Sequence, residues 1–545
     1  MNNPSSTGEK PTMARITGPS LVRNTDIEAE ERAPTVDELK ELALQHAREL
    51  IEVACEPPNE PSGAERSVKE VESSLWNGVL GFGRALLTLF LAVVNERLED
   101  MVPPSLECGG RLFRRGVLKA RNLETLFGVV RYWRRHMRPA NSDDDGGGFF
   151  PLDVAVGLSS DRFTMGVFSL AVRLATRMSF EDAHTTLGWF VPTPPSTEVI
   201  EQATLGFGRY TREWFESACA PDDDGEVLIA MFDSKGIPTA TEEELSKRRG
   251  KRKKNKHPKS ARHRGRQQRK ARGKKPRRNK GDKSKNAKMA TLVVMYTLRR
   301  HGDKLLGPIN RWHYASLAPK KHAFAIARRE ADKRGFCAGS GKTVQVVTDG
   351  DPDLQRYCKE YFPEAIHTLD VIHAVEKLWT AGACLFREGS DDLRAWIAKQ
   401  RERLYDGNVR QVVAELRKHL EATPKTGPGN KGKRERLSKT IDYLDKRVSM
   451  MNYDVLLAAD LEISSGPVEG AVKYIIGRRC DYGGMRWVRE RAEAILQLRC
   501  IDANGDWESF IDFVHTRMRD EGNAEGKRVR LQRKEPQALP QLSEI

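Results

Sequence analysis

Three short apolar runs, VLIAMF, LVVMY and VQVV, restrict the fold of this chain more than any other feature of its sequence. Each run has the length of a strand and is bounded by polar residues. Because apolar and polar positions do not alternate within them, they predict central strands that are buried on both faces. Amphipathic helical patterns, such as residues 319–335, separate the runs. The sequence therefore predicts a mixed α/β domain.

Acidic residues stand where two of these runs stop, at Asp233 and Asp349. Sites in open α/β sheets gather at strand ends. A third carboxylate, Glu469, lies at the start of a later helix, and three such groups could hold hard cations such as Mg²⁺ or Mn²⁺. A simpler interpretation stays open for each residue, because Asp233 and Asp349 could form turns and Glu469 could favour a helix start.

Two further residues, Asp370 and His373, form a DxxH pattern where a predicted strand meets a helix. Asp370 could equally be only a helix N-cap, with His373 as a neighbour of the helix dipole. Asp351 is followed by Pro352 and predicts an N-cap with proline in the first helical position. That pattern accounts for Asp351 but does not account for Asp349.

Taken in order, three segments carry a resemblance. They are "FDSKG", "VVTDGDPDLQRYCKEYFPEAIHTLDVIHAVEKLW" and "SSGPVEGAVKYIIGRRCDYGGMRWVRERAEAILQLRCIDANGDW". Together they resemble bacterial insertion-sequence transposases of the Kra type, relatives of the Mutator-like DDE transposases. The similarity covers roughly residues 105 to 510 and is strongest from Lys342 to Trp507.

The resemblance implies an RNase H-like mixed sheet with a helical insertion, preceded by a mainly helical, DNA-binding N-terminal region. It implies that Asp233, Asp349 and Glu469 are the metal-binding catalytic triad and that Asp370 and His373 are a second signature. The implied activity is water attack on a phosphodiester at transposon ends, followed by attack of the freed 3′-OH on target DNA. The chain departs from the family in the sequence DSKG around Asp233 and in having only Cys108 where relatives carry cysteine pairs, so no zinc is predicted.

Positive charge is concentrated in one segment. Between Lys247 and Lys285 there are 22 Lys and Arg and one acid, whereas the whole chain carries +16, so the remainder carries −5. The segment has no aromatic residues, which predicts disorder and phosphate contact rather than base stacking; a solvated loop is the alternative. The residues expected to contact DNA are Lys251, Arg252, Lys253, Lys254, Arg269, Lys270, Lys274, Lys275, Arg277 and Arg278.

Local patterns predict the organisation of the rest. A helix is expected from Thr35 to Ala54 with a Thr35/Glu38 capping box, another over Phe163–Leu187, and a helix beginning at Ser196 or Thr197 that belongs either to a helix-turn-helix or to an ordinary helical hairpin. "ETLFGVVRYWRRHMRP" predicts one half-buried strand. The expected divisions are 1–65, 66–222, 223–373 interrupted by 246–286, 374–460, 461–510 and 511–545.

Cellular location is expected to be the cytoplasm, on the nucleoid. The eight cysteines form no CxxC pair and predict reduced thiols, and none, including Cys480 and Cys500, has the surroundings of a nucleophile. The apolar stretch from Leu75 to Val94 could span a bilayer, but a buried helix is the stronger prediction. "GFCAGSGKT" does not fit a P-loop, so no ATP site is expected. The expected partners are transposon ends, target DNA and further copies of the chain.

Two alternatives to a transposase stay open on sequence alone. One is an RNase H-like nuclease or resolvase that cuts without strand transfer. The other is an inactive, DNA-binding derivative. Inverted repeats flanking the gene would favour the transposase over both.

Overall fold

The structure is a computed structural model that describes residues 32–55, 67–108, 111–141, 147–249, 287–482 and 484–524. The chain divides into two compact units, which are described separately below. Residues up to Val167, with two short later segments, form the first unit, and most residues from Phe168 to Met518 form the second. Helices and mixed sheets are both present, which confirms the mixed α/β class.

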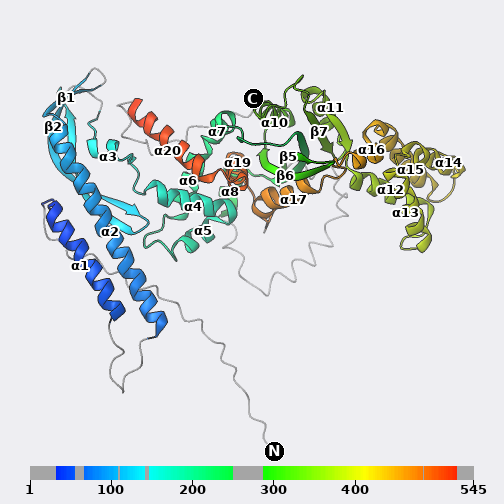
Figure 1. Cartoon of the computed structure of the whole chain (residues 1–545). Helices are drawn as coiled ribbons and strands as arrows, with labels where there is room; N and C mark the ends of the chain where they lie inside the picture. The colour runs from blue at the N-terminus through cyan, green and yellow to red at the C-terminus, as the bar shows by residue number, and fades with distance from the viewer. Residues whose placement is uncertain are drawn as a thin grey trace, which may run out of the picture. The chain divides into compact units, whose positions relative to one another are not determined.

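The first unit begins with a helical hairpin of α1 (Val36–Cys55) and α2 (Val68–Met101) (Figure 1). The predicted capping box starts α1, because the Glu38 N–H donates to Thr35 Oγ1 and the Thr35 N–H donates to the Glu38 carboxylate. A second capping box, between Ser67 and Glu70, starts α2. The predicted helix from Thr35 to Ala54 is confirmed within one residue at each end.

A three-stranded antiparallel sheet follows, in the order β1 (Ser105–Cys108), β2 (Arg111–Thr125) and β3 (Gly128–Pro139). The prediction of one strand through "ETLFGVVRYWRRHMRP" is wrong, because the chain turns back at Leu126–Phe127. Apolar residues at this turn gave no turn signal in the sequence, and Gly128 supplies the positive φ of 104° that closes it. The N-terminal region is therefore less helical than expected. The short helix α3 (Pro151–Ala155) completes the core of this unit, which contains Leu91, Leu123, Val130, Tyr132 and Leu152.

Helix α2 is only partly buried, in contrast to the buried helix predicted for Leu75–Val94. Leu80, Ala85 and Leu91 face α1 and the sheet, whereas Trp76 and Phe90 are about half exposed. It is the one helix in the described part of the chain that is long and apolar enough to cross a membrane, a test that core helices of soluble proteins also pass. One face of α2 is therefore buried and the opposite face is exposed, and both faces carry large apolar residues.

Four helices lead to the main sheet: α4 (Met165–Arg177), α5 (Phe180–Leu187), α6 (Thr197–Gly208) and α7 (Thr211–Ser217). The single helix expected over Phe163–Leu187 is broken at Met178–Ser179. Ser179 stops the first helix and caps the second, since its Oγ accepts the Asp182 N–H at 3.0 Å. Ser196 caps α6, as predicted.

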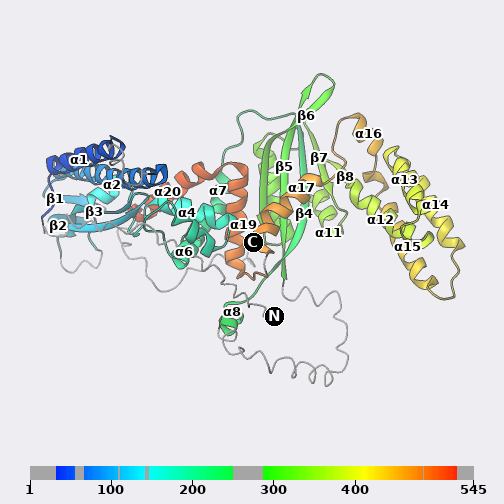
Figure 2. The same cartoon turned by 90° about the horizontal axis from the view of Figure 1, so that it is seen from below.

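The second unit is built on a five-stranded sheet with the order β6-β5-β4-β7-β8 (Figure 2). Strands β4 and β5 pair antiparallel, as do β5 and β6, whereas β4–β7 and β7–β8 pair parallel. The three apolar runs lie in β4, β5 and β7 and are buried, as predicted. The strands are β4 (Val227–Pro238), β5 (Ala287–His301), β6 (Lys304–Ser316), β7 (Thr343–Thr348) and β8 (Ile366–Leu369).

Helices cover both faces of this sheet. Figure 1 shows α10 (Lys320–Lys333) and α11 (Pro352–Tyr361) on one side and α17 (Gly466–Ala471) on the other. The rings of Phe232 on β4 and Phe324 on α10 stack at 3.9 Å, which fixes α10 over the central strand. The remaining helices here are α8 (Glu242–Arg249), α19 (Arg489–Asn504) and α20 (Trp507–Ala524).

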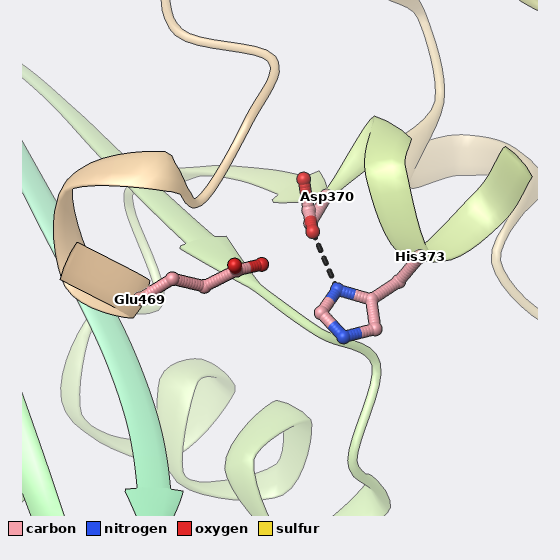
Figure 3. A group of neighbouring side chains, drawn as sticks. All are labelled: Asp370, His373 and Glu469. Carbon is pink, nitrogen blue, oxygen red and sulfur yellow. Dashed lines mark hydrogen bonds and ion pairs between the residues drawn. The ribbon is translucent and has the colours of Figure 1, made fainter. Parts of the chain in front are cut away.

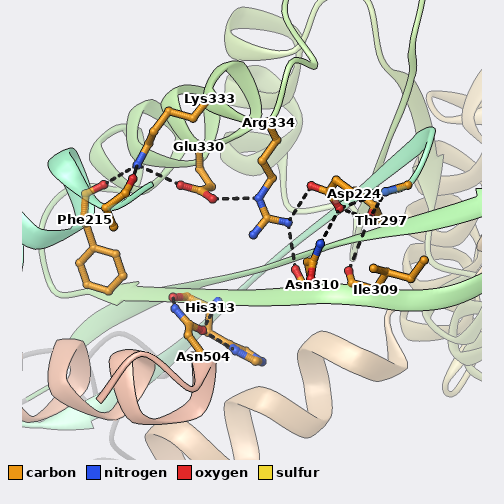
Figure 4. A network of polar contacts seen from close by, with 12 residues as sticks. Phe215, Asp224, Thr297, Ile309, Asn310, His313, Glu330, Lys333, Arg334 and Asn504 are labelled. Atoms are coloured by element: carbon orange, nitrogen blue, oxygen red, sulfur yellow. Dashed lines mark hydrogen bonds and ion pairs between the residues drawn. The ribbon is translucent and has the colours of Figure 1, made fainter. Parts of the chain in front are cut away.

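Polar contacts tie the edge strand β6 to these helices (Figure 4). Arg334, which follows α10, donates to Glu330 at 2.8 Å and to the Asn310 carbonyl at 2.9 Å. The His313 N–H donates to Asn504 Oδ1 at 2.7 Å. Because Glu330 and Arg334 are both nearly buried, their pairing satisfies charges that would otherwise be costly in the interior.

A helical block follows β8, as predicted for the segment after His373. It consists of α12 (Val371–Leu385), α13 (Asp391–Tyr405), α14 (Val409–Ala422), α15 (Asn430–Asp445) and α16 (Tyr453–Ala458), with a 3₁₀ turn at Val448–Met450. These helices share a core that continues into the sheet at Leu369. The chain then returns to the sheet at α17, a π-helix (Val472–Gly477) and α18 (Arg478–Cys480).

Candidate active site

The register of the sheet aligns three acidic residues across neighbouring strands. Phe232 on β4 pairs with Thr348 on β7, and Thr348 pairs with Leu369 on β8. These are the last parallel pairs, and the next residues along the three strands are Asp233, Asp349 and Asp370. The three residues therefore lie in one row at the carboxyl edge of the parallel strands, where sites in α/β sheets are typically found.

Strand β4 does not end at Asp233, which corrects the sequence prediction. Its antiparallel pairing with β5 continues to Pro238, opposite Ala287. Only the parallel pairing with β7 ends before Asp233, because β7 itself stops at Thr348. Asp233 is therefore paired with Leu292 of β5 on one side and lies just beyond the end of β7 on the other.

Asp233 is half-buried and lies within electrostatic range of the other predicted site residues. Burial raises the pKa of its carboxyl above the ordinary value, and the charges of Asp349 and Glu469 raise it further. The N–H of Ser234, which donates to Asp233 Oδ1 at 2.6 Å, and the charge of His373 act in the opposite direction. A carboxylate whose pKa is raised by like charges is favoured in its ionised form when a cation lies beside it.

Asp349 begins the turn between β7 and α11. Its Oδ1 accepts the N–H of Asp351 at 2.8 Å, and Asp351 caps α11 as predicted, accepting from Asp353 and Leu354. The next residue, Gly350, has a φ of 84° and is completely enclosed. A Cβ at Gly350 would lie 2.6 Å from Tyr443 Oη and 2.9 Å from Leu369 Cδ1, so only glycine fits this turn.

Two side chains from α15 and the residues after it hold the same turn, and no local pattern indicated them. Tyr443 Oη donates to the carbonyl of Asp349 at 2.7 Å, and Arg447 donates to the carbonyl of Gly350 at 2.7 Å. Because both bonds go to backbone oxygens, they fix the position of Asp349 without using its carboxylate.

Glu469 projects from the first turn of α17, which packs against β4 and β5. Val468 beside it is fully buried and anchors the turn, while the Glu469 side chain is 32% exposed, with Lys473 Nζ at 3.9 Å. A π-helix begins directly after α17, where an ordinary helix was expected. Such π-helical turns are frequent at functional sites.

Asp370 is fully buried and links three elements (Figure 3). Its oxygens accept hydrogen bonds from the Ile372 N–H, from the N–H and hydroxyl of Ser465, and from His373 Nδ1 at 2.5 Å. The N-cap interpretation of Asp370 is therefore correct for α12. It is incomplete, because the same carboxylate also holds the residues that start α17.

The Asp370–His373 pair is charged. Burial alone would raise the pKa of Asp370, but the bonds from His373 and Ser465 outweigh it and hold the pKa below its ordinary value. The bond to Asp370 raises the pKa of His373 to about 9, against the opposing effect of burial. His373 is thus an imidazolium at neutral pH and contributes positive charge near Asp233 and Asp349.

The closest group of possible ligands among the described residues is not the predicted triad. It is Asp370, His373 and Glu469, whose oxygen and nitrogen atoms lie within 4.8 Å of one another (Figure 3). Both oxygens of Asp370 already accept hydrogen bonds, and one of these joins Asp370 to His373 Nδ1, so the two side chains hold each other in place. Asp370 and His373 position the segments that meet at this edge of the sheet, and Asp233, Asp349 and Glu469 stay the predicted metal ligands.

The donor set of Asp233, Asp349 and Glu469 fits a divalent cation such as Mg²⁺ or Mn²⁺. All three offer carboxylate oxygens, which hard cations prefer, and all three are partly exposed. Burial is the main reason why the pKa of Asp233 is raised, and the charges of Asp349 and Glu469 raise it further. Positive charge between the three carboxylates would relieve this repulsion. The arrangement suits chemistry on a phosphate ester, where negative charge must be stabilised.

Other residues singled out in the sequence lie elsewhere. The ten lysines and arginines expected to bind DNA fall in 250–286, outside the described residues. Gly341 and Lys342 lead into strand β7 instead of a helix, a context that does not suit a phosphate loop. Burial raises the pKa of Cys480 to about 12, so its thiol stays protonated. Trp487 and Trp507 are buried core residues.

The sheet order and the row of carboxylates follow from the strand pairing of the second unit. The chain matches no protein-family model, and a search of curated proteins finds no match.

Proposed function

We propose that the protein is a DDE transposase that cuts DNA at the ends of its element and joins them to target DNA. The observation that carries the proposal is the placement of Asp233 and Asp349 directly after the last pair of two parallel strands, with Glu469 in electrostatic range. The sheet order, an antiparallel meander extended by two parallel strands, supports the RNase H-like core that the resemblance implies. The helical block between Asp370 and Glu469 corresponds to the implied insertion.

In this proposal Asp233, Asp349 and Glu469 hold one or two Mg²⁺ (or Mn²⁺) ions. When bound, such ions activate an attacking oxygen and stabilise the leaving oxygen of a phosphodiester. Tyr443 and Arg447 hold the Asp349 turn, and Asp370 holds the residues that begin α17. His373, as an imidazolium, places a positive charge near the substrate phosphate.

Two reactions follow in sequence. Water first attacks a phosphodiester at the element end and releases a 3′-OH, and that 3′-OH then attacks a phosphodiester of the target and displaces a second 3′-OH. Each step exchanges one P–O bond for another, so neither needs an external energy source or a covalent protein intermediate. This balance is consistent with the expectation that no ATP is used.

The partners proposed for this activity are transposon ends, target DNA and further copies of the chain. The basic segment, which includes Lys251–Lys254 and Arg277–Arg278, supplies the charge for phosphate contact. The rest of the chain is net negative, so this segment is the main electrostatic attraction for DNA. The location that follows from these partners is the cytoplasm, on the nucleoid.

Cleavage of end-bearing DNA tests the proposal. Asp233→Asn, Asp349→Asn and Glu469→Gln should each lower Mg²⁺-dependent cleavage about a hundredfold to a thousandfold while leaving DNA binding intact. Asp353→Asn is the matched control, because Asp353 is an exposed acid on α11 close to Asp349. The Asp353→Asn protein should cleave DNA as the wild type does. Chelation of the metal should stop the wild-type reaction, and full activity in any one of the three variants would refute the triad.

Mapping of the 3′ ends and of joined products separates the proposal from its alternatives. A transposase yields both a free 3′-OH at the element end and a covalent junction with target DNA. Cleavage without junctions would identify a nuclease or resolvase. Binding without cleavage by the wild-type protein would identify an inactive derivative.

A further inference from the structure

An apolar stripe runs along the side of α2 that faces away from the first unit. Its exposed members are Trp76 (49%), Val79 (47%), Leu86 (44%) and Phe90 (52%). They are spaced three and four residues apart, with Gly83 in the middle, so they share one face of the helix and repeat as the a and d positions of a heptad. Four large apolar side chains in one exposed line are far from the scattered exposure usual for a soluble domain.

The other faces of α2 are occupied. Gly78 lies against Leu50 of α1, and Leu91 is in the core with the sheet. Phe127, from the β2–β3 turn, packs against Gly83 and is itself 38% exposed, so its ring widens the stripe at its centre. Within the described residues of the first unit, Phe127 covers Gly83, whereas Trp76, Val79, Leu86 and Phe90 stay about half exposed.

Charged residues continue the same stripe at both ends. Glu72 and Lys69 precede Trp76 by about one and two helical turns, and Arg97 and Asp100 follow the half-buried Val93 at the same two spacings. All four charged residues are exposed, and no ion pair or hydrogen bond joins their side chains to another described residue. Along the helix, a positive and a negative residue (Lys69 and Glu72) therefore precede the apolar stripe, and a positive and a negative residue (Arg97 and Asp100) follow it.

We propose that two copies of the chain pair through α2 in antiparallel orientation. A two-fold axis between Gly83 and Leu86 places each a position opposite a d position of the other copy. Every charged residue then meets one of opposite sign, whereas parallel pairing would set each charge against itself. The facing pairs are Lys69 with Asp100, Glu72 with Arg97, Trp76 with Val93, Val79 with Phe90, and the Phe127 ring that lies on Gly83 with Leu86.

The pairing has the dimensions of a stable coiled-coil interface. From Lys69 to Asp100 the helix is about 48 Å long, which gives five facing layers on each side of the two-fold axis. The three apolar layers would be buried and the charged layers would form the ends, the distribution seen in isologous interfaces with an apolar core and a polar rim. The inference concerns the first unit alone and does not depend on the proposed function.

The test is the mass of the full-length protein in solution, measured by sedimentation equilibrium. Val79→Asp should halve the mass, because two carboxylates would be buried in the interface and weaken it about a hundredfold or more. Val455→Asp is the matched control: Val455 is 62% exposed on α16, and its variant should keep the wild-type mass. Circular dichroism of both variants checks that they fold.

Charge exchange tests the orientation. Glu72→Lys or Arg97→Glu alone should weaken the association roughly tenfold, since each creates two like-charge contacts. The double variant Glu72→Lys/Arg97→Glu restores opposite charges only in the antiparallel pair and should recover the wild-type dissociation constant. A double variant as weak as the single ones would overturn the proposal.

Two other results would also overturn it. One is that the Val79→Asp variant has the same mass in solution as the wild-type protein. The other is a monomer that floats with vesicles of phosphatidylcholine and phosphatidylglycerol and loses this binding in Val79→Asp, which would identify a lipid surface as the occupant. Neither result depends on DNA cleavage, so failure here leaves the proposed function standing.

Discussion

Asp370 is a single buried side chain that joins three segments of the candidate site by hydrogen bonds. It accepts hydrogen bonds from the start of α12, from His373 and from Ser465 before α17. The DxxH pattern drew attention to Asp370 and His373 in the sequence. Ser465 could not be recognised in the same way, because its partner lies 95 residues earlier and only the folded sheet brings them together.

Replacement of Asp370 by Asn tests this positioning role. The amide keeps the shape but presents a donor where His373 and the Ser465 hydroxyl now donate, so the free energy of unfolding should fall by about 2–3 kcal/mol. Cleavage should fall more than DNA affinity does. Asp391→Asn is the control for stability, since Asp391 is 98% exposed and should change the free energy by less than about 0.5 kcal/mol.

The measurements for this variant are urea unfolding and cleavage kinetics on the same preparations. An Asp370→Asn protein as stable and as active as the wild type would show that the hydrogen bonds of Asp370 do not hold α17. Loss of activity that is fully explained by unfolding would reduce its role to stability alone.

Among the helices and strands, those with a strong local pattern were predicted and those set by distant contacts were not. The central strands β4, β5 and β7 follow apolar runs, and α10, α11 and the capped starts of α1 and α6 follow apolar periodicity and N-cap residues. The β2–β3 turn was missed because Leu126 and Phe127 are apolar and carry no turn signal. In the structure Phe127 packs against Gly83 of α2, a contact that the local sequence does not reveal. The continuation of β4 past Asp233 depends on its pairing with β5, which no local signal reveals.

The turn after β7 gives a prediction at the scale of one structural element. Gly350→Ala places a methyl group 2.6 Å from Tyr443 Oη in a backbone with positive φ. The resulting strain and displacement should cost about 2–4 kcal/mol of unfolding free energy and should displace Asp349, lowering cleavage.

Gly339→Ala is the matched control for that change. Gly339 has a φ of 81°, close to the 84° of Gly350, but a Cβ there would meet nothing within 4 Å. Its cost should therefore be only that of the backbone conformation, about 1 kcal/mol. Urea denaturation of both variants separates crowding from strain, and equal costs would contradict the enclosed packing of Gly350.

At the scale of the whole molecule, positive charge is concentrated in one basic segment, and the remainder of the chain carries −5. The sequence alone reveals this distribution of charge. Only the structure shows that Asp370 is buried and hydrogen-bonded whereas Glu469 is partly exposed. The predicted carboxylates could be proposed from sequence because each follows an apolar run or a glycine–proline helix start. Their mutual arrangement could not, since it depends on the register of β4, β7 and β8.

Neutralising the basic segment tests its assigned role. Replacing Lys251, Arg252, Lys253, Lys254, Arg269, Lys270, Lys274, Lys275, Arg277 and Arg278 by Gln should weaken DNA binding at low salt. Each basic side chain that binds a phosphate contributes about 0.9 to the slope of log affinity against log salt, and its replacement should remove that contribution. Thermal unfolding should be unchanged. A salt slope equal to that of the wild type would show that other residues bind the phosphates.

The hydrogen bonds that Tyr443, Arg447 and Tyr453 send to the ends of β7 and β8 bear on any attempt to shorten this protein. Because these three side chains belong to the helical block, replacing the block with a linker would release the backbone at Asp349 and Gly350 and at Leu369, directly before Asp370. The block is thus part of the scaffold of the candidate site and not a detachable module. A shortened protein made from the sheet and its covering helices alone would keep the carboxylates in its sequence but lose the contacts that hold two of them in place.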